Sequence, residues 1–413
     1  MQTNVPNRAA GERLPETTGQ STPAERPSAT SGYHRYPFYA PRFWHGMRPA
    51  TWWSLLRQGR FRVHPKRLAM LFSVTFATPV NTLLCWMQRL FFFRQIRDAE
   101  LHGPPVFIVG HWRSGTTLLH ELLVMDERLS SPSTFQCFAP HHFLLTEWFF
   151  RRFFSWLLPG KRPMDNMATG WDRPQEDEFA LMNLGLPSPY RNLAFPLQEP
   201  GDLDYLDFDG VPDRDLQVWL RKLRRFLLDV SSVTGRPLVI KSPTHTGRIA
   251  ALAKAFPDAR FIHVTRDPHA LYPSTDRLWA SLSDVQGLQM RASPRDANDG
   301  RSKRYIVECF QRMYRAFFRD RDGIEKGRIV ELRYEDLIAD PVENLERIYK
   351  TLHLSEFDSV RPIVEKWVQT EHRNYRVNQH QLRDEDAATI EEAWHEYFEA
   401  YGYPVRRGET ASD

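Results

Sequence analysis

One short loop, residues 110–117, combines two glycines with an arginine, a serine and two threonines. An apolar run, residues 106–109, precedes the loop, and an apolar helical pattern begins at Leu118. The pattern predicts a strand, a tight turn and the N-terminus of a helix. The free N–H groups of a first helical turn, together with the helix dipole, attract anions. We therefore expect the loop to bind a phosphate or a similar group.

The residue types inside the loop separate two kinds of group transfer. Gly110 and Gly115 let the backbone turn and approach a ligand closely, and Arg113 offers a planar set of donors. The phosphate-binding loop of many kinases has a lysine directly after its second glycine, whereas this chain has Thr116 there. A small-molecule kinase also needs Mg²⁺. We therefore keep the kinase only as an alternative function.

A second anion site is predicted around Arg266. This arginine follows an apolar strand pattern, residues 260–265, and Ser274 lies about two helical turns further on. Both side chains could therefore reach one anion beside the end of the strand. Taken alone, the segment could instead be an ordinary strand-to-helix turn in which Asp267 caps the helix.

Together, the two motifs resemble those of the sulfotransferases that use 3′-phosphoadenosine 5′-phosphosulfate (PAPS), in particular the bacterial and tyrosylprotein branches. The resemblance extends over residues 104–405. It implies that the 3′-phosphate of PAPS is held by Arg266 and Ser274. It implies that the 5′-phosphosulfate is held by Arg113, Ser114, Gly115, Thr116 and Thr117.

The resemblance also implies the reaction, which is transfer of a sulfuryl group to a hydroxyl or amine of an acceptor. A sulfuryl group carries less charge than a phosphoryl group, so we expect no metal ion. Preorganised donors would then stabilise the transition state, namely backbone N–H groups, Arg113, and Lys241 or His245. By the same resemblance, Arg373 or Arg376 lies near the phosphates of PAPS. A surface loop is the alternative for that segment.

The base that accepts the proton of the acceptor is left open, because Gln136 stands where many relatives have a glutamate. We choose His142 as the catalytic base, because it follows this segment and begins an aromatic stretch. The alternatives are His141, Glu147 and the acidic run Glu176–Glu178. The substituted glutamate also keeps a second alternative function open, an inactive homologue that binds lipid or membrane.

Two aromatic segments point to an apolar environment. Leu68–Trp86 carries no formal charge over 19 residues, and Phe143–Leu158 contains seven aromatic residues. Residues 68–93 could span a membrane, lie on its surface or pack against the core, and the polar residues within them disfavour a span. An acceptor that is a lipid or a carbohydrate, and a peripheral membrane contact, are the corresponding expectations for partners.

Composition and the order of the predicted elements indicate the class of protein and its fold. The net charge of +4 among 413 residues is too small to indicate nucleic acid, and three scattered cysteines favour the cytoplasm. Alternating strand and helix patterns predict an α/β fold that resembles P-loop proteins, with three layers and a central parallel sheet between helices.

The order of these segments along the chain predicts its division into regions. We expect a disordered tail at 1–32, a helical and aromatic-rich N-terminal region at 33–100, the sulfotransferase domain at 101–405 and a tail at 406–413. The oligomeric state is left open.

Overall fold

The computed structural model describes residues 39–158, 170–290, 300–371 and 382–406. Contacts divide the chain into residues 1–33 and 34–413, and every described residue belongs to the second unit. The predicted tail at 1–32 therefore lies outside the described residues, as do all but Arg406 of the predicted tail at 406–413, Arg373 and Arg376.

Four strands form one parallel sheet in the order β2-β1-β3-β4. The strands are β1 Val106–Val109, β2 Val239–Lys241, β3 Arg260–Thr265 and β4 Ile329–Arg333. The first half of the chain contributes the helices α1 Pro49–Gln58, α2 Leu68–Phe91, α3 Phe93–Arg97, α4 Thr116–Leu123, α5 Thr134–Phe138, α6 Phe143–Phe153 and α7 Asp177–Asn183. The second half contributes α8 Asp213–Thr234, α9 Ile249–Ala255, α10 Pro268–Gln286, α11 Arg301–Asp320, α12 Tyr334–Ala339, α13 Pro341–Thr351, α14 Arg361–Thr370, α15 Asp384–Ala393 and α16 His395–Tyr401.

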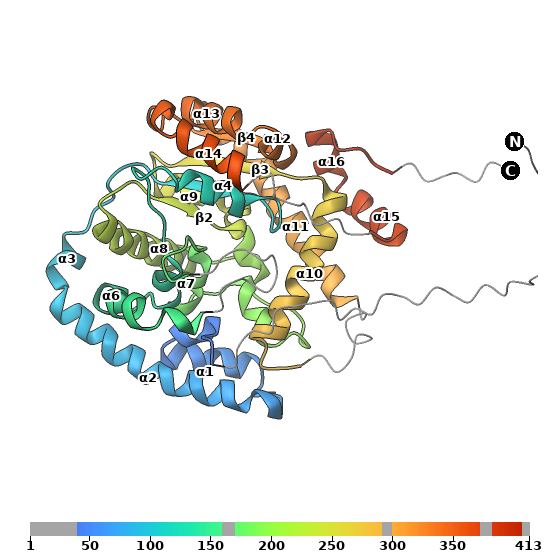
Figure 1. Ribbon diagram of the computed structural model, residues 1–413. Coiled ribbons are helices and arrows are strands. Elements are labelled where there is room, and N and C mark those ends of the chain that lie inside the picture. The colour runs from blue at the N-terminus through green and yellow to red at the C-terminus, as the bar shows by residue number, and fades with distance from the viewer. Residues whose placement is uncertain (1–38, 159–169, 291–299, 372–381, 407–413) are drawn as a thin grey trace, which may run out of the picture. The chain divides into compact units, whose positions relative to one another are not determined.

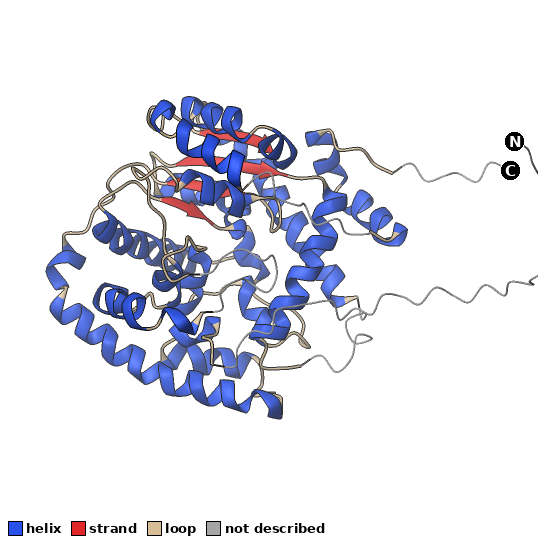
Figure 2. Ribbon diagram, viewed as in Figure 1, coloured by secondary structure: helices blue, strands red, loops and turns tan. Residues whose placement is uncertain are grey.

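Short 3₁₀ helices connect these elements. They are η1 Phe43–Gly46, η2 Pro65–Arg67, η3 Ser155–Leu157, η4 Pro189–Ala194, η5 Leu203–Leu206, η6 Pro243–Arg248, η8 Arg321–Gly323 and η9 Phe357–Ser359. Figure 2 shows the strands gathered in one place among the helices.

Alternation along β1 explains why helices cover both faces of the sheet. Val106 and Ile108 pack into one apolar cluster with residues of α4, α12, α13 and α14. Phe107 and Val109 point to the opposite face and join a larger cluster with α8, α10 and α11. A strand buried on both faces reads as a continuous apolar run, which is the pattern of residues 106–109. The predicted three-layer α/β fold with a central parallel sheet is thereby confirmed (Figure 1).

Two element bounds have local causes. The α-helix that follows β2 begins only at Ile249, because residues 243–248 form η6 behind Pro243. Helix α10 continues to Gln286, and Gly287 follows it. The sequence analysis missed α8, although its apolar side is buried in the core.

The N-terminal helices share the core of the sheet. Trp44 of η1 and Trp52 of α1 are fully buried in the larger apolar cluster. Asn81 of α2 donates to the backbone oxygens of His45, at 2.6 Å, and Met47, at 2.8 Å. Polar contacts thus fix α2 against η1, in addition to apolar packing.

Candidate active site

The loop after β1 is a tight turn that requires its two glycines. Gly110 has φ +139°, and a Cβ there would lie 2.4 Å from the backbone oxygen of Val264. Gly115 caps α4 with φ +100°, and a Cβ there would lie 2.3 Å from the ring of Tyr334. Arg113 itself has φ +70°, a conformation that costs energy in a residue with a side chain. The chain therefore accepts local strain to present Arg113 in this loop.

The structure brings the two predicted anion sites together. The Nε of Arg113 donates to the Ser274 hydroxyl at 3.0 Å. A guanidinium nitrogen of Arg266 donates to the backbone oxygen of Arg113 at 2.7 Å. The contact arises because β1 and β3 are parallel neighbours, so the segments that follow them leave the same edge of the sheet.

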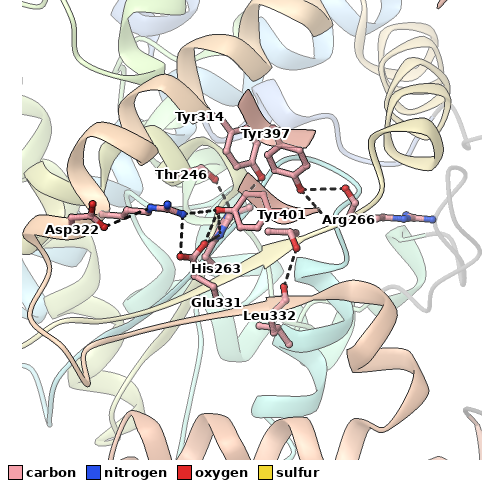
Figure 3. Close-up of polar contacts among 12 residues, drawn as sticks. Thr246, His263, Arg266, Tyr314, Asp322, Glu331, Leu332, Tyr397 and Tyr401 are labelled. Atoms are coloured by element: carbon pink, nitrogen blue, oxygen red, sulfur yellow. Dashed lines mark hydrogen bonds and ion pairs between the residues drawn. The ribbon is translucent and has the colours of Figure 1, made fainter. Parts of the chain in front are cut away.

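Arg266 is held by its surroundings at both backbone and side chain. Its guanidinium lies over the ring of Tyr334, 4.5 Å from the ring centre. The Tyr397 hydroxyl accepts from the Arg266 N–H at 3.0 Å and donates to the Arg266 carbonyl at 3.2 Å. Figure 3 shows the guanidinium extending away from Tyr397. With the backbone anchored and the side chain only 7% exposed, Arg266 is fixed before any ligand binds.

A polar network supports the strands behind Arg266 (Figure 3). Glu331 of β4 accepts from the Tyr401 hydroxyl at 2.6 Å and hydrogen-bonds to His263 Nδ1 at 2.8 Å. Burial alone would raise the pKa of Glu331, but the hydrogen bond and charge of His263 outweigh burial and lower that pKa to about 2. This network joins β3, β4 and α16.

The loop retains donors that a ligand could use. The Ser114 side chain is fully buried, and its hydroxyl has no hydrogen-bond partner among the described residues. The first turn of α4, at Thr116 and Thr117, carries N–H groups that lack partners within the helix. A buried hydroxyl, free N–H groups and two arginines form a donor set that fits an anionic group such as a phosphosulfate. Within the described residues, no group of three or more His, Cys, Asp or Glu side chains is placed to hold a metal ion.

A second constellation adjoins the loop through Trp112. The indole N–H of Trp112 donates to the Tyr190 hydroxyl at 2.7 Å, and Tyr190 donates to Glu176 in turn. The other carboxylate oxygen of Glu176 lies 2.6 Å from Lys241 Nζ at the end of β2. Burial, reinforced by the Glu176 charge, raises the pKa of Tyr190 well above its usual value. Tyr190 therefore remains a donor, and the Glu176 carboxylate is oriented from both sides.

Asp177 and Glu178, the other two acidic residues of the run, pair with basic side chains of η6. Asp177 lies 2.9 Å from His245, and Glu178 lies 2.6 Å from Arg248, all with fully buried side chains. Burial alone would raise the pKa of Glu178, but the Arg248 guanidinium outweighs burial and holds that pKa below its usual range. These pairs anchor the start of α7 and leave Glu176 as the member of the run that faces the loop.

The two histidines of the predicted base set lie elsewhere. His142 uses both ring nitrogens, bonding Thr146 at 2.8 Å and Asn81 at 3.1 Å. Burial lowers its pKa to about 4. His141 bonds the backbone oxygen of Asn183 at 3.1 Å, and burial lowers its pKa to about 3. These bonds tie both histidines to α2, α6 and α7, and the role of His142 as base stays a prediction.

Gln136 and Glu147 bond to each other. The Gln136 amide donates to one oxygen of Glu147 at 2.9 Å, and the Ser133 hydroxyl donates to the other at 2.9 Å. Ser133 and Gln136 also cap α5 reciprocally. The glutamine that replaces the family's glutamate therefore has a structural role at this helix start.

Sequence reasoning missed Tyr190 and the support from Tyr397. Tyr190 follows Ser188 and Pro189 in η4, and no motif marks it. Tyr397 lies 131 residues from Arg266 in the chain. Only the folded arrangement reveals these contacts.

Comparison with known proteins agrees with this geometry. A model of the sulfotransferase family matches residues 104–359. The chain is 40% identical over 383 residues to the omega-hydroxy-beta-dihydromenaquinone-9 sulfotransferases Stf3 of Mycobacterium bovis and of Mycobacterium tuberculosis, covering 93% of this chain and 97% of each relative.

Two solved structures share the fold. Sulfotransferase STF9 from Mycobacterium avium aligns with a TM-score of 0.63 and 18% identity, covering 87% of this chain and 98% of that chain. Sulfotransferase STF1 from Mycobacterium tuberculosis H37Rv aligns with a TM-score of 0.54 and 18% identity, covering 83% of this chain and 90% of that chain.

Proposed function

Because the chain belongs to the sulfotransferase family, we propose that it transfers the sulfuryl group of PAPS to a hydroxyl group on a long apolar lipid. Membership rests on a family match over most of the chain and on relatives aligned over nearly their full length. It removes the small-molecule kinase as an alternative. The donor, the acceptor and the residues that act on them are the proposed parts.

One observation carries the choice of donor, which is the joining of Arg113, Ser274 and Arg266 at the sheet edge. PAPS carries a phosphosulfate on the 5′ oxygen and a phosphate on the 3′ oxygen of the same ribose, so it needs two anion sites that lie close together. We assign the 5′ end to residues 113–117 and the 3′-phosphate to Arg266 and Ser274. Ser274 and the Arg113 carbonyl would then link the two sites.

The residues around the loop are suited to this transfer. When bound, PAPS supplies a sulfuryl group whose bond to the 5′-phosphate oxygen breaks as the acceptor oxygen attacks sulfur. The N–H groups of α4 and the Arg113 guanidinium stabilise the negative charge on the transferred and leaving oxygens. Glu176 accepts the proton of the acceptor hydroxyl, while Lys241 and Tyr190 hold its carboxylate toward the loop.

Geometry favours Glu176 over His142 as this base. Tyr190 hydrogen-bonds to Glu176, and Trp112 of the loop hydrogen-bonds to Tyr190, so these two side chains link Glu176 to the loop. His142 is bound at both ring nitrogens by Thr146 and Asn81, away from residues 110–117. A base must lie within reach of the proton that it removes.

The acceptor is proposed from the relatives. Their names specify a menaquinone derivative with an omega-hydroxyl group, and identity of 40% over 93% of this chain supports a related acceptor. A hydroxylated isoprenoid lipid also suits a protein with many exposed aromatic side chains. We place the reaction at the cytoplasmic side of a membrane, which the free cysteines Cys85, Cys137 and Cys309 favour.

Incubation with ³⁵S-labelled PAPS tests the proposed reaction. We expect label in an omega-hydroxylated menaquinol and none in the same lipid without the hydroxyl group. Label found only in glycans or small molecules would refute the lipid acceptor. Absence of transfer to any component of a total lipid and glycan extract would instead support an inactive homologue.

The donor site is tested separately by Arg266→Ala. Loss of a charge-assisted hydrogen bond costs about 1.5–3 kcal/mol, so we expect affinity for 3′-phosphoadenosine 5′-phosphate to fall roughly 10- to 150-fold in calorimetry. Arg361→Ala, which removes a surface partner of Glu346, should leave this affinity unchanged. Equal affinity of the Arg266→Ala variant and the wild type would refute the assignment.

A further inference from the structure

Helix α2 carries an exposed apolar face. Phe72, Phe76, Leu83, Trp86 and Leu90 are between 57% and 77% exposed. Their spacing of three and four residues, with one step of seven, places them on one side of the helix. Figure 1 shows α2 as the outermost helix along its edge of the fold. We call these five side chains the α2 apolar face.

The opposite side of α2 is bound firmly to the domain. Thr78, Asn81 and Gln88 are buried there. Asn81 donates to the backbone of η1, and the Trp52 indole donates to Thr75 at 2.9 Å. A helix that left the domain to cross a bilayer would place these polar groups in hydrocarbon, which is costly.

Length and composition alone would allow a membrane span. The most apolar 18-residue window of Pro65–Phe91 has a mean hydropathy of 1.6, and 22% of that window is buried inside the protein. A core helix would be mostly buried, and a spanning helix would not need the polar contacts to η1 and α1. Low burial on one side with polar anchoring on the other is the pattern of a helix that lies along an interface.

The positive charge of the residues around α2 indicates which kind of surface the α2 apolar face contacts. Residues 39–97 contain ten arginines and lysines and no aspartate or glutamate. Exposed positive side chains lie before and after the middle of the helix in the chain, and they are Arg57, Arg60, Arg62, Lys66, Arg89 and Arg94, whereas Arg97 is paired with Asp98 at 2.7 Å. These positive side chains complement anionic lipid headgroups. A second copy of the chain docked through this face would bring like charges together, so a symmetric dimer is disfavoured.

We propose that α2 lies in the plane of an anionic membrane surface with its apolar face inserted among the lipids. The exposed aromatics of α6, which are Trp148, Phe149 and Phe153, extend the apolar surface on a helix that packs against α2. The inference deepens the proposed function, because a lipid acceptor would reside in the same membrane. Membrane binding by α2 could nevertheless occur even if the protein did not transfer a sulfuryl group to a lipid.

Aromatic contacts connect this surface to the proposed base. Phe43 of η1, the 3₁₀ helix that Asn81 anchors, lies 4.3 Å from Phe179 between ring centres. Phe179 stacks on Tyr190 at 4.7 Å, and Tyr190 bonds Glu176. The buried rings of Phe43, Phe179 and Tyr190 therefore form a continuous series of contacts from η1, which packs on α2, to Glu176.

Sedimentation of the full chain with lipid vesicles tests the proposal. Wild type should bind vesicles of phosphatidylcholine mixed with phosphatidylglycerol, and bind less at high salt or to phosphatidylcholine alone. Phe76→Glu with Leu83→Glu should lower the vesicle partition coefficient on the order of a hundred-fold or more. Val233→Glu with Ile363→Glu places two charges at similarly exposed apolar sites on α8 and α14 and should leave binding unchanged.

Three outcomes would overturn the proposal. Unchanged vesicle binding by the Phe76/Leu83 variant would show that another surface binds lipid. Resistance of the bound wild type to alkaline carbonate would indicate a span. A dimer in light scattering that the variant dissociates would indicate a second copy instead. Calorimetry with 3′-phosphoadenosine 5′-phosphate shows whether each variant is folded and still binds the donor product. A variant that binds this nucleotide but not vesicles has lost membrane binding alone, whereas a wild type that binds vesicles but not the nucleotide would contradict the proposed function.

Discussion

Glu176→Gln is expected to lower kcat for sulfuryl transfer by about 10²–10⁴-fold, because an amide cannot accept the proton of the acceptor hydroxyl. The glutamine oxygen can accept from Tyr190 or from Lys241 but not from both, and the buried Lys241 ammonium loses its counter-charge, so thermal unfolding of the variant is measured beside its activity. Affinity for 3′-phosphoadenosine 5′-phosphate should change little, since Arg113, Ser274 and Arg266 remain. Steady-state kinetics with the labelled donor, together with calorimetry, measure the two effects separately.

His142→Gln supplies the matched comparison, since His142 is the base expected from the sequence. If Glu176 is the base, the His142 variant should keep kcat within a few-fold of wild type, in line with a role in packing α6 against α2. A large loss of kcat for His142→Gln with near-normal activity for Glu176→Gln would reverse the assignment. Losses in both variants with lowered thermal stability would indicate a structural cause.

Local patterns were enough to predict the sheet and the strand, loop and helix start over residues 106–118. Strand β1 is a continuous apolar run followed by a glycine, and these features act within a few residues of each other. The pairing of the loop with Arg266 and Ser274 could also be anticipated, because the carboxyl ends of neighbouring parallel strands lie at one edge. The structure adds the specific bond from Arg113 to Ser274.

The surroundings of Glu176 could not be predicted in the same way. Its partner Lys241 is 65 residues away in the chain, and Tyr190 comes from an irregular segment without a motif. The preference for His142 rested on its position beside an aromatic stretch. Folding places that histidine against Asn81 of α2, a contact between segments 61 residues apart. Long-range pairing of loops therefore decided which carboxylate faces the anion site.

The same long-range pairing makes Glu178 and Arg248 central to stability. Both side chains are fully buried, and the Arg248 guanidinium also donates to the backbone oxygen of Tyr205 at 2.6 Å. Thr244 donates to the same carboxylate at 2.8 Å. Removal of one member of a buried pair leaves a charge without compensation, which is more costly than loss of the pair. Because Glu178 lies in the first turn of α7 and Glu176 is the N-cap residue of that helix, this pair also fixes the proposed base.

Arg248→Met should therefore lower the free energy of unfolding by about 3–5 kcal/mol in urea titrations at neutral pH. Without the guanidinium, burial should raise the pKa of Glu178. The destabilisation of the variant should then decrease as pH falls through that raised pKa, because the carboxyl group becomes neutral. The wild type loses stability as pH falls below about 4.5, because its lowered Glu178 pKa stabilises the fold only while the carboxylate is charged. The stability gap should consequently narrow on acidification.

Two further variants separate a buried charge from lost packing. Glu178→Gln added to Arg248→Met should recover part of the loss, since no unpaired carboxylate remains. Arg319→Met, which breaks ion pairs with Asp320 and Asp209 at a side chain that is 48% exposed, should cost less than about 1 kcal/mol. If Arg248→Met cost no more than Arg319→Met, or if its deficit widened at low pH, the Glu178–Arg248 pair would not be what holds the start of α7 against η6.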